Sequence, residues 1–365
     1  MDYNQIRRKS RAFSVGGVGI GGTHPVSIQS MANTDTHDVE KTYRQALALE
    51  GAGCDILRLA IPDVSCTKTI FELKSRGIKM PLVADIHFDY RIALAAIEAG
   101  ADKIRINPGN IGSRERTEAV VRACADKKIP IRIGVNSGSV ERSLLEKHGG
   151  VSAAALVESA LGHAKILDGL GFLDYAISVK ASNVPLTLAA NRLLAASTDA
   201  PIHLGVTEAG ARTRAVVKSS IGIGALLSEG IGDTVRVSLT DDPCEEITAA
   251  REILSALEIG ARGMDIVSCP TCGRTKINLI NLLSEFEEAA GREGLLDFDV
   301  KVALMGCAVN GPGEAREADV GIAGGTHEGL LFKKGEIIRK VSEDKLVAEL
   351  IREIKIIRDE RKNGG

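Results

Sequence analysis

The sequence contains no tryptophan, and aromatic residues make up only 3% of its 365 residues. A surface that binds nucleic acid by stacking bases on aromatic rings is therefore not expected. The formal net charge is −2, so no basic excess attracts a polyanion. With so few aromatic residues, the core has to be built from Val, Ile, Leu and Ala, and this composition favours parallel strands covered by helices.

Long apolar runs are also missing, and the first ten residues lack the apolar stretch of a secretory signal. We therefore expect a cytoplasmic protein without a membrane partner, in which the seven cysteines are reduced. Four of these cysteines have no neighbour at metal-ligand spacing, and the simplest interpretation is that they are small buried hydrophobic residues. They are Cys54, Cys66, Cys124 and Cys244.

A unit that repeats along the first two thirds of the chain predicts the fold. Each unit has a short apolar stretch that ends in polar residues, followed by an amphipathic stretch of helical length. The predicted strands are residues 26–30, 56–61, 82–87, 103–107, 131–136, 175–181, 202–208 and 234–240. The helices between them are expected to begin near Val39, Thr67, Tyr90, Arg114, Ala153, Val184, Thr213 and Glu245. This α/β pattern predicts a TIM (β/α)8 barrel. A doubly wound open sheet is the alternative, because periodicity does not show closure.

A glycine-rich segment precedes the barrel and a smaller domain follows it. Gly17, Gly19 and Gly22 match GxGxxG, but a strand follows them where a dinucleotide site needs a helix. We therefore expect residues 11–23 to form a hairpin that closes one end of the barrel. The barrel domain is assigned residues 1–257, and a small α+β domain, which carries two cysteine-containing loops, is assigned residues 258–365. In that second domain we expect a strand before the first cysteine loop, strands at 300–305, 320–323, 330–332 and 337–341, and helices at 276–293 and 344–361.

Five predicted strands carry a cation near the C-terminal end, where TIM barrels have their active site. The cations are Arg58, Arg105, Arg132, Lys180 and Arg236. Buried cations are costly without an anion, and Arg forks match phosphate oxygens, so the expected ligand is a diphosphate. The alternative is a set of internal salt bridges to Asp85, Glu208 and Asp241. Further substrate-binding candidates at the strand ends are Asp85, His87, Asn107, Asn136, Ser182 and Ser238.

Two cysteine-containing loops each follow an apolar strand near the C-terminal end of the chain. They read Ser268-Cys-Pro-Thr-Cys-Gly-Arg274 and Met305-Gly-Cys-Ala-Val-Asn-Gly-Pro-Gly-Glu-Ala315. The candidate metal ligands are Cys269, Cys272, Cys307 and Glu314. Iron–sulfur clusters are usually held by four thiolates. A hard carboxylate as the fourth ligand should leave one iron easily given up to a substrate oxygen. We therefore favour a catalytic cluster, with structural zinc and free thiols as alternatives.

Five further blocks are long and unusual. They are Ser30-Met-Ala-Asn-Thr-Asp-Thr36, Arg105-Ile-Asn-Pro-Gly-Asn-Ile-Gly112, Gly134-Val-Asn-Ser-Gly-Ser139, Ser178-Val-Lys-Ala-Ser182 and His203-Leu-Gly-Val-Thr-Glu-Ala-Gly210. With both cysteine loops they resemble the 4-hydroxy-3-methylbut-2-enyl diphosphate synthase family in its bacterial two-domain form. The resemblance implies reductive opening and dehydration of 2-C-methyl-D-erythritol 2,4-cyclodiphosphate in non-mevalonate isoprenoid biosynthesis.

The same resemblance implies a [4Fe–4S] cluster, with flavodoxin or ferredoxin as the electron donor, and a homodimer. It also implies that the three cysteines of the two loops and Glu314 are the cluster ligands. In the mechanism that we expect, the five cations hold the diphosphate and Glu314 leaves the cluster when the substrate arrives. Glu208 supplies a proton as water leaves. Asn310 hydrogen-bonds the substrate or a cluster sulfur.

Two functions of other kinds fit parts of the sequence. One is an aldolase barrel in which Lys180, surrounded by other cations, forms a Schiff base while the cysteine loops hold zinc. The other is a binding module in which the C-terminal domain docks nucleic acid or protein. The near-neutral charge and the lack of aromatic residues argue against nucleic acid as the partner.

Overall fold

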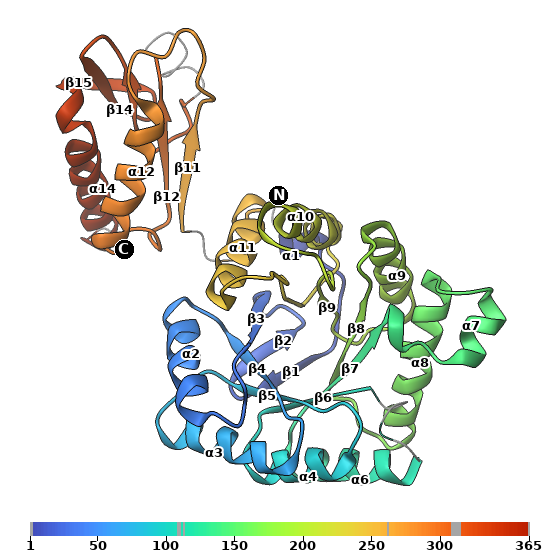
Figure 1. The fold of residues 1–365 in the computed structure, drawn as a ribbon. Helices are drawn as coiled ribbons and strands as arrows, with labels where there is room; N and C mark the ends of the chain where they lie inside the picture. The colour runs from blue at the N-terminus through green and yellow to red at the C-terminus, as the bar shows by residue number, and fades with distance from the viewer. Residues whose placement is uncertain (1–2, 108–110, 112–113, 261–262, 308–314, 364–365) are drawn as a thin grey trace. The chain divides into compact units, whose positions relative to one another are not determined.

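The computed structural model describes residues 3–107, 111, 114–260, 263–307 and 315–363. The chain divides into two compact units, Met1–Gly260 and Ala261–Gly365 (Figure 1). This division lies three residues beyond the boundary assigned from the sequence. Ile259 explains the difference, because its side chain packs into the hydrophobic core of the first unit.

The first unit is built on eight strands that all pair in parallel in the order β8-β7-β6-β5-β4-β3-β10-β9. Their bounds are β3 (Ser27–Met31), β4 (Ile56–Ala60), β5 (Leu82–Asp85), β6 (Lys103–Ile106), β7 (Ile131–Asn136), β8 (Tyr175–Lys180), β9 (His203–Leu204) and β10 (Thr234–Val235). A parallel bridge between Ile177 and Ile202 joins the two ends of this order. The sheet is therefore closed, which confirms the TIM barrel and excludes the open sheet.

Eight helices cover the barrel from outside (Figure 1). They are α2 (Val39–Gly51), α3 (Thr67–Ser75), α4 (Tyr90–Glu98), α6 (Arg114–Lys127), α8 (Ala153–Gly169), α9 (Val184–Ser197), α10 (Arg212–Ser228) and α11 (Pro243–Ala256). Six begin at the predicted residue, and α10 and α11 begin one and two residues earlier. Side-chain caps fix several of these starts. Asp38, Asp89 and Asn183, for example, each accept a hydrogen bond from a backbone N–H of the first turn.

Some short elements were not predicted. They are α1 (Tyr3–Ile6), η1 (Val64–Cys66), η2 (Ser137–Ser139) and α7 (Arg142–His148). The helix α7 has no buried residue, so it carries no apolar period that a sequence pattern could detect. Strands β9 and β10 are also shorter than predicted. Beyond Leu204 the chain passes through Gly205, which lies close to the carbonyl oxygen of Arg236, and continues into a loop.

The glycine-rich segment forms the predicted antiparallel hairpin, β1 (Ala12–Val15) with β2 (Val18–Gly21). Its apolar side chains Phe13, Val15 and Ile20 form one buried cluster with Ile56, Val83 and Ala176 from the barrel strands. Ile56 and Val83 each lie two residues before Arg58 and Asp85 on the same strands, hence on the same face. The hairpin therefore plugs the end of the barrel that is opposite to the cations.

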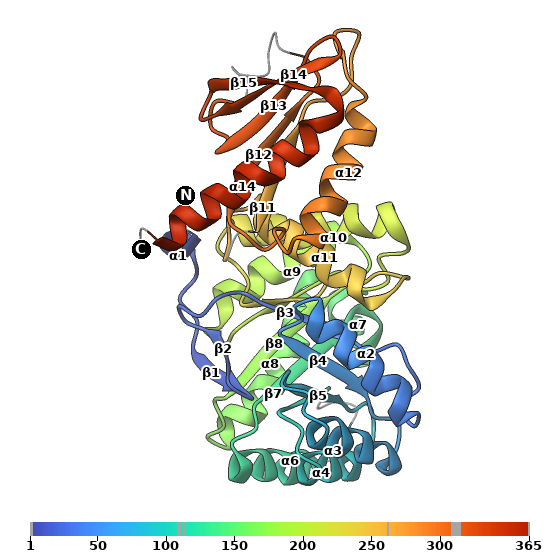
Figure 2. The ribbon, with the colours of Figure 1, turned by 90° about the vertical axis from the view of Figure 1, so that its left-hand side faces the viewer.

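The second unit contains a five-stranded mixed sheet in the order β11-β12-β13-β14-β15, and two helices pack on it (Figure 2). The strands are β11 (Met264–Ser268), β12 (Val300–Met305), β13 (Val320–Gly324), β14 (Glu328–Lys333) and β15 (Glu336–Ser342). The helices are α12 (Leu279–Arg292) and α14 (Leu346–Asn363), the latter preceded by the turn η3 (Glu343–Lys345). Phe286 of α12 and Leu350 and Ile354 of α14 share one core with the sheet. The predicted α+β domain is confirmed.

Among the described residues, no helix has the length and apolar character that crossing a membrane requires.

Candidate active site

The cations predicted at the strand ends gather inside the barrel around Asp85, which is only 2% exposed. Arg105 donates to Asp85 at 3.1 Å, Arg58 lies 3.7 Å from it, and His87 Nε2 lies 3.4 Å from it. Burial by itself would raise the pKa of Asp85. Arg58, His87 and Arg105 outweigh burial and hold the pKa of this carboxyl well below its usual range. Asp85 is therefore a permanent anion that anchors two of the five cations.

Arg132 and Lys180 have no such anchor among the described residues. Arg132 donates one hydrogen bond at 2.6 Å to Ser178 Oγ, while its buried Nε and Nη2 atoms have no hydrogen-bond partner. Lys180 is 6% exposed. Burial, and then the charges of Arg132 and Arg236, push the pKa of its ammonium well below the ordinary value. Both side chains thus keep donor capacity for an anion that the protein does not itself supply.

Arg236 is paired by a residue that the sequence reasoning missed. Its Nη2 donates at 3.0 Å to Glu246 Oε1, and Ser30 Oγ donates at 2.9 Å to Glu246 Oε2. Glu246 belongs to α11, so no pattern on the strands pointed to it. The alternative of internal salt bridges therefore holds for Arg58, Arg105 and Arg236. For Arg236 the partner is Glu246, which was not among the three carboxylates considered from the sequence.

A second layer of buried polar side chains lies inside the barrel, two residues before the layer of cations along the strands. The sequence did not predict it. Lys103 precedes Arg105 by two residues on β6, so both face the barrel interior, and Lys103 is 1% exposed. Burial, followed by the charges of Arg132 and Arg58, lowers the pKa of Lys103 to about 7. Gln29 has no hydrogen-bond partner on either side-chain atom, and His203 has none on Nε2. The only sequence signal for this layer is a lysine on the inward face of a barrel strand.

Two glycines make room for the cations, because they have no side chain. A Cβ atom at Gly134 would lie 2.6 Å from Arg105 Nε, and one at Gly205 would lie 2.6 Å from Lys180 Nζ. Real Cβ atoms do not approach other atoms so closely, so any side chain here would displace a guanidinium or an ammonium. Both glycines are part of the blocks that carry the family resemblance, and the structure gives their physical reason.

The remaining predicted residues of the barrel stand around its mouth. Asn107 is buried, Asn136 ends β7, and Ser182 and Ser238 are half-buried. Glu208 is exposed, and its backbone has φ +51°, in the left-handed region that residues other than glycine rarely adopt. Such strain is often kept at functional positions. Asn310 and Glu314 lie outside the described residues.

The two cysteine loops follow neighbouring parallel strands, since Ser268 at the end of β11 pairs with Leu304 of β12. Gly306 N–H donates to Cys269 Sγ at 3.2 Å. Cys272 is exposed, and hydrogen bonds from Arg274, the backbone bond first, lower the pKa of its thiol. Cys307 follows two residues after β12 and is half-buried. Backbone donors and a thiol that ionises readily are the features that metal-binding sulfur requires.

With this geometry in hand, comparison with known proteins decides the family. Residues 10–251 match the GcpE TIM-barrel domain, and residues 265–356 match the GcpE protein C-terminal domain.

The chain belongs to the GcpE family.

Curated relatives of this GcpE chain are similar over almost their whole length. A protein of Caldanaerobacter subterraneus subsp. tengcongensis is 54% identical, with 98% of this chain and 99% of the relative covered. A relative from Clostridium perfringens is 57% identical, with 96% of this chain and 99% of the relative covered. A relative from Bacillus subtilis is 53% identical, with 97% of this chain and 93% of the relative covered. All three are named 4-hydroxy-3-methylbut-2-en-1-yl diphosphate synthase (flavodoxin). The family resemblance that the motifs carry is confirmed.

Solved structures resemble the GcpE barrel in fold alone. The 3-dehydroquinate dehydratase of Geobacillus kaustophilus gives a TM-score of 0.51 at 16% identity, over 69% of this chain and 98% of its own. The enzyme from Clostridium difficile gives 0.50 at 15% identity, over 68% and 98%.

The cysteine positions of this GcpE chain fit a shared metal centre. Cys269 and Cys272 lie on the loop after β11, and Cys307 lies on the loop after the neighbouring strand β12. Thiolates from two adjacent loops are ligands that an iron–sulfur cluster takes, and zinc takes the same ligand type.

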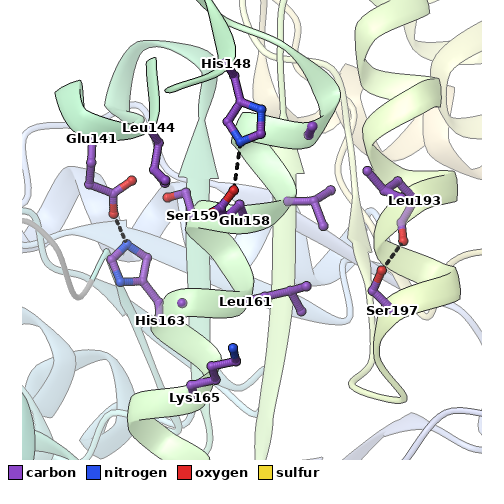
Figure 3. A pocket seen from close by; sticks show the side chains of 13 residues that line it. Glu141, Leu144, His148, Glu158, Ser159, Leu161, His163, Lys165, Leu193 and Ser197 are labelled. Atoms are coloured by element: carbon purple, nitrogen blue, oxygen red, sulfur yellow. Dashed lines mark hydrogen bonds and ion pairs between the residues drawn. The ribbon is translucent and has the colours of Figure 1, made fainter. Parts of the chain in front are cut away.

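A separate cavity of about 580 Å³ lies between α7, α8 and α9. Figure 3 shows two histidine–glutamate pairs beside it: His163 Nε2 lies 2.8 Å from Glu141, and His148 Nε2 lies 2.7 Å from Glu158. None of the strand-end cations lines this cavity, so it is no part of the candidate active site.

Proposed function

We propose that this chain is a 4-hydroxy-3-methylbut-2-en-1-yl diphosphate synthase. In this proposal it opens 2-C-methyl-D-erythritol 2,4-cyclodiphosphate reductively and removes water, giving 4-hydroxy-3-methylbut-2-enyl diphosphate for non-mevalonate isoprenoid biosynthesis. The names of the full-length relatives support this activity, and the barrel supplies the matching chemistry.

The observation that carries the proposal is the unbalanced charge inside the barrel. Arg58, Arg105 and Arg236 share the two buried carboxylates Asp85 and Glu246, while no described carboxylate pairs with the other two cations. Desolvated cations are costly, and an arriving diphosphate offsets this cost by accepting their hydrogen bonds. A dianionic or trianionic substrate is therefore the ligand that fits this interior.

In this proposal the five cations hold the phosphates from several strands at once. His87 and the amide and hydroxyl side chains at the mouth orient the carbon skeleton; these are Asn107, Asn136, Ser182, Ser238 and, beyond the described residues, Asn310. Asp85 holds Arg58 and Arg105 in position. The glycines at 134 and 205 keep the cations free of steric contact.

Cys269, Cys272 and Cys307, with Glu314 as the expected fourth ligand, would hold a [4Fe–4S] cluster. When bound, the cluster supplies the two electrons of the reduction one at a time. Glu208 stands on the barrel rim and is the proposed proton donor to the leaving hydroxyl group. General acid assistance of this kind contributes about 10²- to 10⁴-fold to the rate.

The proposed partners follow from the relatives and from the redox chemistry. Reduced flavodoxin is the electron donor that the relatives' names indicate, and ferredoxin is the alternative. The active form is proposed to be a homodimer in the cytoplasm, where thiols stay reduced.

Binding of the cyclodiphosphate to the anaerobically purified protein tests the proposal directly. Arg132→Met should weaken binding by about 30-fold or more, since truncating one partner of a buried charged contact costs at least about 2 kcal/mol. Arg122→Met is the matched control, because Arg122 is exposed on α6. Equal affinities of the wild type and Arg132→Met, measured by titration calorimetry, would show that the cations serve another purpose.

One observation supports the alternative hypothesis of an aldolase, namely the lowered pKa of Lys180. Borohydride reduction in the presence of a phosphosugar substrate or the cyclodiphosphate decides between the two. We expect no mass increase at Lys180, whereas a stable adduct would favour Schiff-base chemistry.

A further inference from the structure

Three side chains of metal-binding type converge on the barrel rim in the first unit. His37 lies in the loop after β3, Asp63 caps the turn η1 after β4, and Cys66 ends that turn. One ligand atom from each, the imidazole nitrogen, a carboxylate oxygen and the thiol sulfur, lie within 4.8 Å of one another. Cys66 was expected to be a small buried hydrophobic residue, because His37 comes from a separate loop and completes the group only in the folded barrel.

The histidine is oriented as metal-binding histidines usually are. His37 Nδ1 lies 2.8 Å from Asp35 Oδ1, and Nε2 lies 2.8 Å from Asp63 Oδ2. A carboxylate on one ring nitrogen fixes the tautomer and directs the other nitrogen toward a metal. Asp35 is in the position of this outer carboxylate, and Nε2 points to Asp63.

The two oxygens of the Asp63 carboxylate have different partners. Its Oδ1 accepts hydrogen bonds from the backbone N–H of Ser65 at 2.8 Å and from Ser65 Oγ at 2.6 Å. These bonds hold Asp63 at the start of η1 and leave Oδ2 facing His37. Cys66, at the end of the same turn, is fully buried, so its sulfur approaches the site from the protein side.

A purely structural explanation accounts for only part of this arrangement. Without a cation, His37 is held between Asp35 and Asp63, whose hydrogen bonds raise the pKa of its ring. Such exposed ion pairs contribute little to stability. They also leave unexplained why a thiol lies within the same small space, where a thiolate, an imidazole and a carboxylate are three ligands of the types that zinc takes.

We propose that His37 Nε2, Asp63 Oδ2 and Cys66 Sγ bind one divalent cation of the zinc type, with Asp35 as the outer carboxylate. A set with one sulfur, one nitrogen and one oxygen favours Zn²⁺ over the hard cations Mg²⁺ and Ca²⁺. Binding requires the thiolate of Cys66, so the thiol proton is released to solvent. Water completes the tetrahedron, and no electron transfer is involved.

The cation would tie together two loops that carry the barrel mouth. The loop with His37 follows β3, which ends at Met31, and the loop with Asp63 and Cys66 follows β4, which contains Arg58. Arg58 Nη2 donates a hydrogen bond to Met31 Sδ at 2.7 Å, so the two strands are already in contact at the barrel mouth. Thr36 Oγ1 already donates to Ala60 O across these loops at 2.7 Å. The proposed site is therefore structural, and it does not depend on the reaction that the barrel catalyses.

Zinc X-ray absorption of the full-length, cluster-loaded protein with one equivalent of Zn²⁺ tests this site, since iron does not contribute at the zinc edge. We expect one sulfur at about 2.3 Å and two or three nitrogen or oxygen atoms at about 2.0 Å. Cys66→Ala should remove the sulfur shell, and the buried Cys124→Ala should not. A shell of two or more sulfurs would instead indicate zinc in the cysteine loops and would overturn the proposal.

Affinity measured by competition with a chromophoric chelator gives the second criterion. Asp35→Asn should weaken Zn²⁺ binding by about 10- to 100-fold, and His37→Ala should abolish the rim site. Both residues are exposed, so these variants are expected to fold. If His37→Ala retains zinc with unchanged affinity and an unchanged sulfur shell, the rim is not a metal site.

Discussion

Replacing Lys103 by methionine should make the protein more stable, although Lys103 is among the most deeply buried side chains. One pKa unit corresponds to about 1.4 kcal/mol. Folding lowers the pKa of Lys103 from 10.5 to about 7, so at pH 7 keeping this lysine in the barrel costs about 4 kcal/mol. Methionine has a similar length and no charge to desolvate, so Lys103→Met should recover most of that free energy.

The sign of the pH dependence follows from the direction of the pKa change. Between pH 7 and 10.5 the unfolded chain keeps a proton on Lys103 that the folded chain has released, so stability of the wild type rises with pH. The advantage of Lys103→Met is therefore largest at and below pH 7. It should shrink to about 1 kcal/mol at pH 10.

Calorimetric melting of the wild type and Lys103→Met at pH 7 and pH 10 measures this difference. For a unit of this size, about 4 kcal/mol corresponds to a rise of about 10 °C in the melting temperature at pH 7. Lys165→Met, an exposed substitution on α8, is the control and should change little. A less stable Lys103→Met protein, or an advantage independent of pH, would refute the assignment of Lys103 as a desolvated amine.

Two further substitutions test the roles assigned at the barrel mouth. Gly205→Ala should lower kcat/KM by about 10-fold or more, because its Cβ would lie 2.6 Å from both Lys180 Nζ and the backbone oxygen of Arg236, so both strand-end cations would shift. The control Gly162→Ala has open space around its Cβ, and equal losses in both variants would contradict the steric argument. Glu208→Gln should leave the visible spectrum unchanged and reduce kcat by about 10²- to 10⁴-fold. Turnover that stays at the wild-type level would remove Glu208 from the mechanism.

The repeating pattern of strands and helices was sufficient to predict the barrel and the place of the cations. Buried parallel strands give continuous apolar runs, so the polar residues that end them stand out. Arg58 and Arg105 were recognised in this way, and the structure places them around Asp85. Closure of the sheet through Ile177 and Ile202 could not be predicted, because hydrophobic period carries no information about which strands pair.

Residues that reach the site from another element were the ones that sequence reasoning missed. Glu246 extends from α11 to Arg236, and no helical period shows which polar side chain turns inward. Cys66 was correctly expected to be buried. Its neighbour His37 was not expected, since it lies in the loop after β3 and reaches Cys66 only because β3 pairs with β4 in the sheet.

The central claim is that the cysteine loops hold a redox cluster that serves the cation-lined barrel. Iron and acid-labile sulfide content of protein purified without oxygen tests this claim most directly. The account predicts about four irons and four sulfides per chain, with a brown absorbance that a strong reductant bleaches. Replacing Cys272 with serine should abolish that absorbance. Stoichiometric zinc in the cysteine loops, with no sulfide, would contradict the account.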